Sequence, residues 1–193
     1  MLTRDFAVGG VFLMALAMGL PAVARADEEA SNGIYVQSGE GGSYYAKSIP
    51  AESYGSKGTT RVYLVKEKED QLVETFDWYA PRIALMGTSK GCAVVRFGSW
   101  PRGHVASAEE LAIAFYLNGK LLHSYSTLDI AGKPDNVSGS VSHYTVIQKV
   151  LGFRWIESNS HALDIVTTDG RTLSFDPDTG LLIPPPTATV PGK

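Results

Sequence analysis

The amino-acid sequence predicts an all-β domain with mostly antiparallel strands, folded as a β-sandwich or a small β-barrel. Roughly ten short segments rich in β-branched and aromatic residues lie between clusters of turn-forming residues. Two hairpin signals, Asn118-Gly119 and Asp169-Gly170, join such segments directly. Besides an N-terminal targeting segment, at most one short helix is expected, and the sequence leaves sandwich and barrel open.

The N-terminal residues have the pattern of a cleaved secretory signal peptide. Arg4 precedes an uncharged apolar run from Phe6 to Leu20, and Ala24 and Ala26 supply the small residues that a signal peptidase reads. The apolar run is shorter than the roughly 20 residues that a spanning helix needs. We therefore expect a periplasmic or secreted protein with no stable membrane anchor after cleavage.

Three regions follow from this pattern. Residues 1–26 are the expected signal peptide, residues 27–183 a single β-rich domain, and residues 184–193 a Pro-rich flexible tail. The whole chain has a formal charge of −3, and removal of residues 1–26, which contribute +1, leaves −4. A mildly acidic domain lacks the basic field that phosphate backbones require, so nucleic acid is not an expected partner. The single cysteine, Cys92, excludes an internal disulfide and is expected to be a packed core residue.

The expected strands alternate with turn segments along the chain. Gly-rich or charged stretches at 39–42, 66–70 and 87–91 mark tight connections between neighbouring strands. The strand segments are Ile34–Val36, Tyr44–Ala46, Arg61–Val65, Leu72–Tyr79, Ile83–Met86, Cys92–Trp100, Leu111–Leu117, Leu121–Tyr125, Tyr144–Ile156, Ala162–Thr167 and Thr172–Phe175.

The segment around Leu111–Leu117 is compatible with either a strand or a helix. Ser107 and Glu110 match the capping box of a helix start, whereas Asn118-Gly119 is the strongest short hairpin signal. We expect the hairpin, with one helical turn at Ser107. Because Leu111–Leu117 is apolar at both parities, this strand is expected to be central and covered on both faces.

No catalytic, nucleotide or metal motif has the required spacing. In residues 55–60 the lysine precedes the second glycine, which is the wrong order for a phosphate-binding loop. Residues 176–180 place glycine one position too early for a calcium loop, so a turn is expected there. The histidines lie too far apart in sequence for a short zinc motif. No catalytic residue, cofactor or metal is therefore assigned.

Two groups of residues are the candidate binding surface for a ligand or partner. The first combines Trp, Pro and Arg after two strands, where Trp and Arg favour binding hot spots but also form internal stacks. The second surrounds the polar stretch 129–142, which is expected to be a long loop and carries acceptors and a histidine. The candidate residues are Trp78, Tyr79, Arg82, Trp100, Arg102 and His104 in the first group, and Asp129, Asp135, His143 and Tyr144 in the second.

Three functional hypotheses remain open from the sequence. The first is an exported module that binds an envelope protein or a small ligand. The second is an envelope hydrolase with a site near His104, Asp129 and His143. The third is a structural component of the envelope, and the sequence does not determine the oligomeric state.

Overall fold

The all-β prediction is confirmed by the computed structural model, which describes residues 30–157 and 160–184. In these residues the chain forms thirteen strands and one short helix, and every pairing between strands is antiparallel. No helix in the described part of the chain is long and apolar enough to cross a membrane. The expected signal peptide and all but the first residue of the expected tail lie outside the described residues.

The first four strands form one antiparallel meander, which we call the N-terminal sheet. Its order is β1 (Tyr35–Ser38), β2 (Tyr44–Pro50), β3 (Lys57–Leu64) and β4 (Gln71–Trp78). The charged tip at 66–70 joins β3 to β4, as the sequence predicts.

The next four strands form a second meander, the middle sheet. Its order is β5 (Ile83–Thr88), β6 (Gly91–Phe97), β7 (Leu111–Leu117) and β8 (Lys120–Ser126). The connection between β7 and β8 has φ of 49° at Asn118 and 77° at Gly119. Both central residues therefore occupy the left-handed region that a two-residue hairpin turn requires, which confirms the hairpin reading of this segment.

The prediction of a helical turn at Ser107 is wrong. The helix α1 (Thr127–Ala131) begins directly after β8, and its capping box consists of Ser126 and Asp129. The backbone groups of Ser107 are used by this helix: its N–H donates to Thr127 Oγ1 and its carbonyl accepts from Leu128 N. Two Ser-x-x-acid patterns compete in the sequence, and only the one at the end of β8 nucleates a helix.

The remaining strands form the C-terminal sheet and a small two-stranded ladder. The C-terminal sheet has the order β11 (Ile147–Glu157), β12 (Ser160–Thr167) and β13 (Thr172–Phe175). The ladder pairs β9 (Ser138–Gly139) with β10 (Tyr144–Thr145). The stretch 129–142 is therefore not one continuous loop, because it contains most of α1 and the strand β9.

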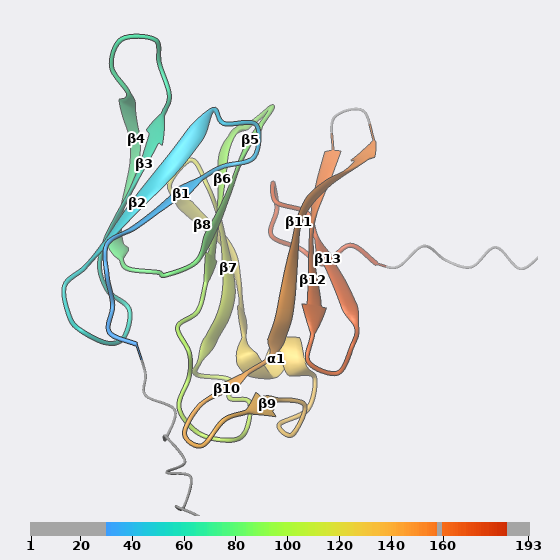
Figure 1. The fold of residues 1–193 in the computed structure, drawn as a ribbon. Helices are drawn as coiled ribbons and strands as arrows, with labels where there is room; N and C mark the ends of the chain where they lie inside the picture. The colour runs from blue at the N-terminus through green and yellow to red at the C-terminus, as the bar shows by residue number, and fades with distance from the viewer. Residues whose placement is uncertain (1–29, 158–159, 185–193) are drawn as a thin grey trace, which may run out of the picture.

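The three larger sheets lie in layers, with the middle sheet between the other two (Figure 1). Neighbouring residues of β6 face opposite layers: Val94 packs in the cluster beside the N-terminal sheet, and Val95 in the cluster beside the C-terminal sheet. On β7, Tyr116 packs against the first cluster and Phe115 belongs to the second. The expectation that Leu111–Leu117 is central and covered on both faces is thus confirmed, and the described strands form no closed barrel.

Glu40, in the turn between β1 and β2, connects all three layers. Its backbone N–H donates to Leu85 O on β5 at 3.0 Å, and its side-chain Oε1 accepts from Phe153 N on β11 at 3.1 Å. The N-terminal and middle sheets approach each other most closely at this edge, where β1 and β2 run beside β5. The opposite edges, β4 and β8, are the last strands of their sheets.

Two adjacent valines test whether both faces of the middle sheet are packed. We expect Val94→Ala and Val95→Ala each to lower the free energy of unfolding by about 2 kcal/mol, because each removes buried methyl groups from a different core. The control Val36→Ala, at a position 58% exposed on β1, should change stability by less than about 0.5 kcal/mol. Urea denaturation measures all three, and a near-neutral effect at either core position would contradict the layered packing.

Candidate functional site

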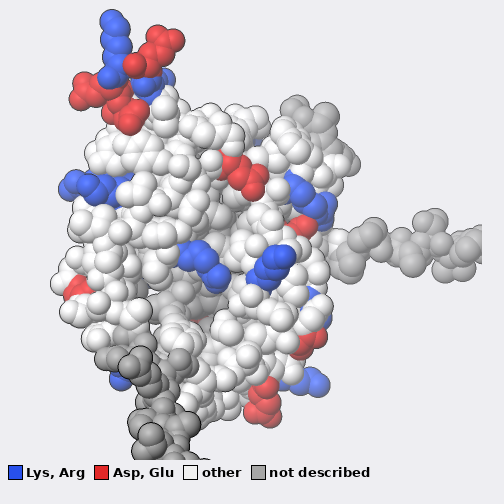
Figure 2. Space-filling view, viewed as in Figure 1, with Lys and Arg blue, Asp and Glu red and all other residues white. Residues whose placement is uncertain are grey.

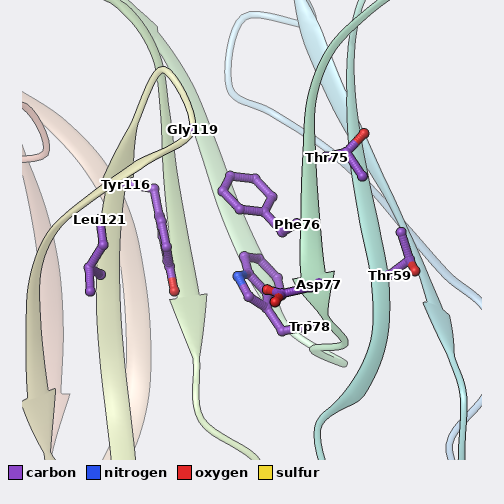
Figure 3. Close-up of a pocket in the computed structure, with 8 residues that line it drawn as sticks. All are labelled: Thr59, Thr75, Phe76, Asp77, Trp78, Tyr116, Gly119 and Leu121. Carbon is purple, nitrogen blue, oxygen red and sulfur yellow. The ribbon is translucent and has the colours of Figure 1, made fainter.

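A cleft at the free edge of the N-terminal and middle sheets is lined by a cluster of aromatic rings that includes the buried Trp78. It lies beside β4 and β8, the edge strands of the two sheets, which form no hydrogen-bonded ladder with each other. Its volume is about 470 Å³. We call it the interlayer cleft (Figure 3), and its lining residues are Thr59, Thr75, Phe76, Asp77, Trp78, Tyr116, Gly119 and Leu121.

Three aromatic rings form the wall of the interlayer cleft. Phe76 and Trp78 stack with ring centroids 4.8 Å apart, and Tyr116 lies 5.0 Å from Phe76 and 5.6 Å from Trp78. Phe76 and Trp78 alternate with exposed residues on β4, so both point toward the middle sheet. Leu121, 57% exposed, adds an apolar edge on β8.

The backbone at Trp78 is held by a buried hydroxyl pair. Thr60 Oγ1 donates to Trp78 O at 2.8 Å and also accepts from Ser48 Oγ, which lies 2.8 Å away. Ser48 Oγ accepts in turn from Ala80 N at 3.1 Å. These bonds anchor the end of β4 to β2 and β3, so the position of the indole ring is fixed by strands deep in the sheet.

The indole N–H of Trp78 has no hydrogen-bond acceptor, although the side chain is only 6% exposed. Figure 3 shows the indole nitrogen on the side of the ring that faces Tyr116, in the space between the two sheets. A buried N–H without an acceptor costs roughly 1–3 kcal/mol, and such groups are rare in folded proteins. The fold therefore leaves this donor without a hydrogen bond.

Arg96 on β6 lies beside Trp78 and carries a second donor of this kind. Its guanidinium carbon is 4.8 Å from the centroid of the Trp78 ring, and its buried Nε–H has no acceptor. Among the described residues Arg96 forms no ion pair, so its positive charge is not neutralised by a carboxylate.

The other end of the interlayer cleft is bounded by an acidic side chain. Glu74 lies close to the β7–β8 turn, where a Cβ added at Gly119 would come within 2.3 Å of Glu74 Oε2. Desolvation raises the pKa of the Glu74 carboxyl. Burial, with a smaller effect of Glu74, also raises the pKa of the Cys92 thiol to about 12. Cys92 is buried in the core, as expected from the sequence.

Of the first group of predicted site residues, only Trp78 lines the interlayer cleft. Tyr79 is 3% exposed and packs inside the fold. Arg82 lies over the Phe97 ring, with its guanidinium carbon 4.6 Å from the centroid, and lines a separate hollow of about 40 Å³ together with Pro101. The internal Arg–Trp stack considered from the sequence does occur, but its arginine is Arg96.

The segments at 100–104 and 143–144, predicted in different groups, lie side by side. The 42% exposed Trp100 stacks on buried His143 with ring centroids 4.7 Å apart, and Arg102 and His143 form a backbone bridge. His143 Nδ1 is 2.8 Å from Ser142 Oγ. Tyr144 is buried, and its hydroxyl lies 2.9 Å from Thr127 Oγ1.

The remaining predicted residues do not form a shared site. Asp129 Oδ2 accepts from Ser126 N at 2.8 Å and from Ser126 Oγ at 2.7 Å, so this carboxylate caps α1. Asp135 and His104 are exposed. No hydrogen bond of Asp129 reaches a histidine, so the carboxylate of the hydrolase hypothesis is engaged in helix capping.

A larger groove runs along the C-terminal sheet beside residues 182–184 and has a volume of about 820 Å³. Its two arginines are already paired: Arg154 Nε bonds to Asp164, and Arg171 Nε lies 2.7 Å from Asp169 Oδ2. Arg171 also donates to the last carbonyls of α1. Both arginines of this groove therefore form ion pairs with aspartates, whereas Arg96 forms none among the described residues.

The face drawn in Figure 2 carries no extended basic patch of the kind that binds a large polyanion. On the face drawn in Figure 2, lysines and arginines are scattered, and charges of both signs gather at the exposed 66–70 tip. In the part of the chain that the structure describes, no three His, Cys, Asp or Glu side chains are placed to hold a metal ion.

Comparison with known proteins adds no relative. No family model, no curated protein sequence and no solved structure matches this chain.

Sequence reasoning missed Phe76, Tyr116 and Arg96 as site residues. Arg96 did carry a signal, because it is the only charge in an otherwise apolar strand, between Val95 and Phe97. A charged side chain in such a strand must find a partner or reach the edge of the layer.

The capping role of Asp129 predicts a defined pH dependence of stability. The hydrogen bonds from Ser126 hold the pKa of the Asp129 carboxyl below its ordinary value of 3.8. A lowered folded-state pKa stabilises the fold above the unfolded-state pKa, and this contribution is lost as pH falls through the folded-state value. We expect Asp129→Ala to lower the free energy of unfolding by roughly 0.5–1 kcal/mol at pH 7, because the site is exposed and the cap is worth about this much.

The difference between Asp129→Ala and the unchanged protein should shrink below about pH 4, as measured by urea denaturation across the pH range. Asp135→Ala is the matched control, since this exposed aspartate forms no side-chain hydrogen bond. An effect of Asp129→Ala that did not diminish at all as the pH falls below 4 would contradict the capping explanation, because the charged form that Ser126 stabilises is then progressively lost.

Proposed function

We propose that the protein is an exported binding module whose ligand is a small planar organic molecule held in the interlayer cleft. The observation that carries this proposal is the buried indole N–H of Trp78, which lines an aromatic cleft and has no acceptor. A ligand acceptor would satisfy it, and the rings would contact the flat part of the same molecule.

The dimensions and composition of the cleft support a small ligand. Its volume of about 470 Å³ lies within the range of small-molecule sites, which combine apolar walls with a few polar groups. The lining residues come from two different sheets, and the rings of Phe76, Trp78 and Tyr116 pack against one another. A ligand would therefore lie against this ring cluster and not between its members. Such a concave site suits a small molecule better than the flat surface of an envelope protein.

The compartment follows from the sequence rather than from the fold. The Arg4 start, the apolar run from Phe6 to Leu20 and the small residues at Ala24 and Ala26 support export to a periplasm or the medium. A ligand met there is a free solute and not a nucleotide of the cytosol.

Paired tyrosine variants test the location of binding. With 2-naphthamide and 2-naphthoate as probes and calorimetry as the measurement, we expect at least one probe to bind the protein purified after expression of the full chain. Tyr116→Ser should weaken that binding by about tenfold or more, because it removes one aromatic wall worth roughly 1–2 kcal/mol.

The matched control is Tyr45→Ser. Tyr45 is also a half-buried, stacked tyrosine, but its partner is Tyr63, outside the cleft, at a centroid distance of 5.0 Å. Binding should survive this change. The proposal fails if neither probe binds, or if binding is insensitive to Tyr116→Ser.

A further inference from the structure

We propose that the ligand of the interlayer cleft is an aromatic amide, a primary carboxamide or a lactam, whose N–H and C=O pair with the backbone of Asp77 at the open edge of β4. This inference rests on the proposed function and specifies its ligand class. The observation that carries it is that four consecutive residues of an edge strand, 75–78, line the cleft.

The interlayer cleft lies across the edge of β4 and not against one of its faces alone. Phe76 and Trp78 are buried in the cluster that β4 shares with the middle sheet. Thr75 and Asp77 alternate with them and are exposed, so their side chains project from the opposite face. Because residues of both faces line the same hollow, a molecule in it meets the backbone edge that lies between the two faces.

Hydrogen bonds at the two ends of the β2–β3 pair determine which backbone groups of β3 point toward β4. Ala51 N donates to Lys57 O at 2.9 Å, and Val65 N donates to Ser43 O at 2.9 Å. The register between these two bonds is unbroken, so residues that bond to β2 alternate with residues that do not. The odd-numbered residues of β3 therefore bond to β2, and its even-numbered residues point toward β4.

The register between β3 and β4 extends this alternation to the open edge. Thr60, which points toward β4, is paired with Phe76. The backbone N–H and C=O of Phe76 therefore bond within the sheet, whereas those of Thr75 and Asp77 point away from it. No strand is paired with this edge of β4, and within the described residues no hydrogen bond uses these outward groups.

Asp77 offers its outward backbone groups between the two ring-bearing residues of β4, Phe76 and Trp78. The N–H and C=O of one extended residue lie side by side on the same edge, as one donor next to one acceptor. A planar amide whose N–H and C=O point in the same direction pairs with both groups, as a neighbouring strand would. The aromatic part of the same molecule then lies against the ring cluster.

The charge of the interlayer cleft favours a neutral amide over an acid. The carboxylate of Asp77 is the one charged group among the described residues that line the cleft, and it forms no ion pair within the described chain. A ligand carboxylate would be repelled by this charge. It also has no N–H to donate to the outward C=O of Asp77.

Three probes that share a naphthalene ring test the amide assignment by calorimetry at pH 7. We expect 2-naphthamide to bind the unchanged protein about fivefold more tightly than 2-acetylnaphthalene, in which a methyl group replaces the amide nitrogen and removes one hydrogen bond. 2-Naphthoate should also bind about fivefold or more weakly than 2-naphthamide, because it lacks the donor and carries a negative charge.

A pair of proline variants tests the backbone contact. Asp77→Pro removes the outward N–H and leaves the bonds between β3 and β4, because proline is tolerated on an edge strand where the N–H faces away from the sheet. It should weaken 2-naphthamide binding by about fivefold or more.

Val36→Pro is the matched control, on the opposite edge strand of the same sheet and outside the cleft. Gly39 N donates to Tyr44 O, so by the register of β1 and β2 the N–H of Val36 also points away from the sheet. Val36→Pro should leave 2-naphthamide binding within about twofold.

Equal affinities for 2-naphthamide and 2-acetylnaphthalene, or tighter binding of 2-naphthoate, would overturn the amide assignment and leave the cleft as a binding site. Absence of binding by both 2-naphthamide and 2-naphthoate would overturn the assignment together with the proposed function. Circular dichroism reports whether Asp77→Pro folds, and if it does not, the comparison of probes in the unchanged protein decides the assignment.

Discussion

The structure depends on the burial of both faces of the middle sheet. Strands β6 and β7 are apolar at successive positions, and Ala93, Val94 and Val95 have no solvent exposure at all. A sheet with water on one face would expose half of these side chains, at roughly 25 cal/mol for each Å² of apolar surface. The N-terminal and C-terminal sheets each cover one face, and the chain folds as three layers rather than as a two-layer sandwich.

Strand composition and turn chemistry account for most of what the sequence predicts correctly. Leu111–Leu117 is apolar at both parities, and this alone indicates a central position. The Asn118-Gly119 dipeptide resolves the competition with a helix, since few other pairs adopt two successive positive φ angles. The short helix was misplaced because Ser107 and Ser126 both precede an acid by three residues. Only tertiary contacts decide which of them caps a helix. The backbone N–H of Ser107 donates to Thr127 Oγ1, and Ser126 is the residue that caps α1.

The candidate site was predicted less well, because its residues come together from two sheets. Trp78 could be singled out by residue type, but Tyr116 and Arg96 lie on strands whose position relative to β4 follows from sheet order. The pattern of a single sequence predicts which side chains share one face of a strand. It does not predict which sheets pack against each other. The contact between Trp100 and His143 was missed for the same reason, because a backbone bridge between distant segments leaves no periodic signal.

The attachment of the N-terminal sheet along one edge has a mechanical consequence. Glu40 ties the β1–β2 turn to β5 and β11, while β4 and β8 share no ladder across the interlayer cleft. When two sheets are connected along one edge, a change in the angle between them alters their separation least at that edge and most at the opposite edge. Small changes in the angle between these two sheets therefore alter the gap at Phe76 and Tyr116 more than any distance near Glu40. The contact between the rings of Phe76 and Tyr116, whose centroids are 5.0 Å apart, is therefore the part of this interface most sensitive to the angle between the two sheets.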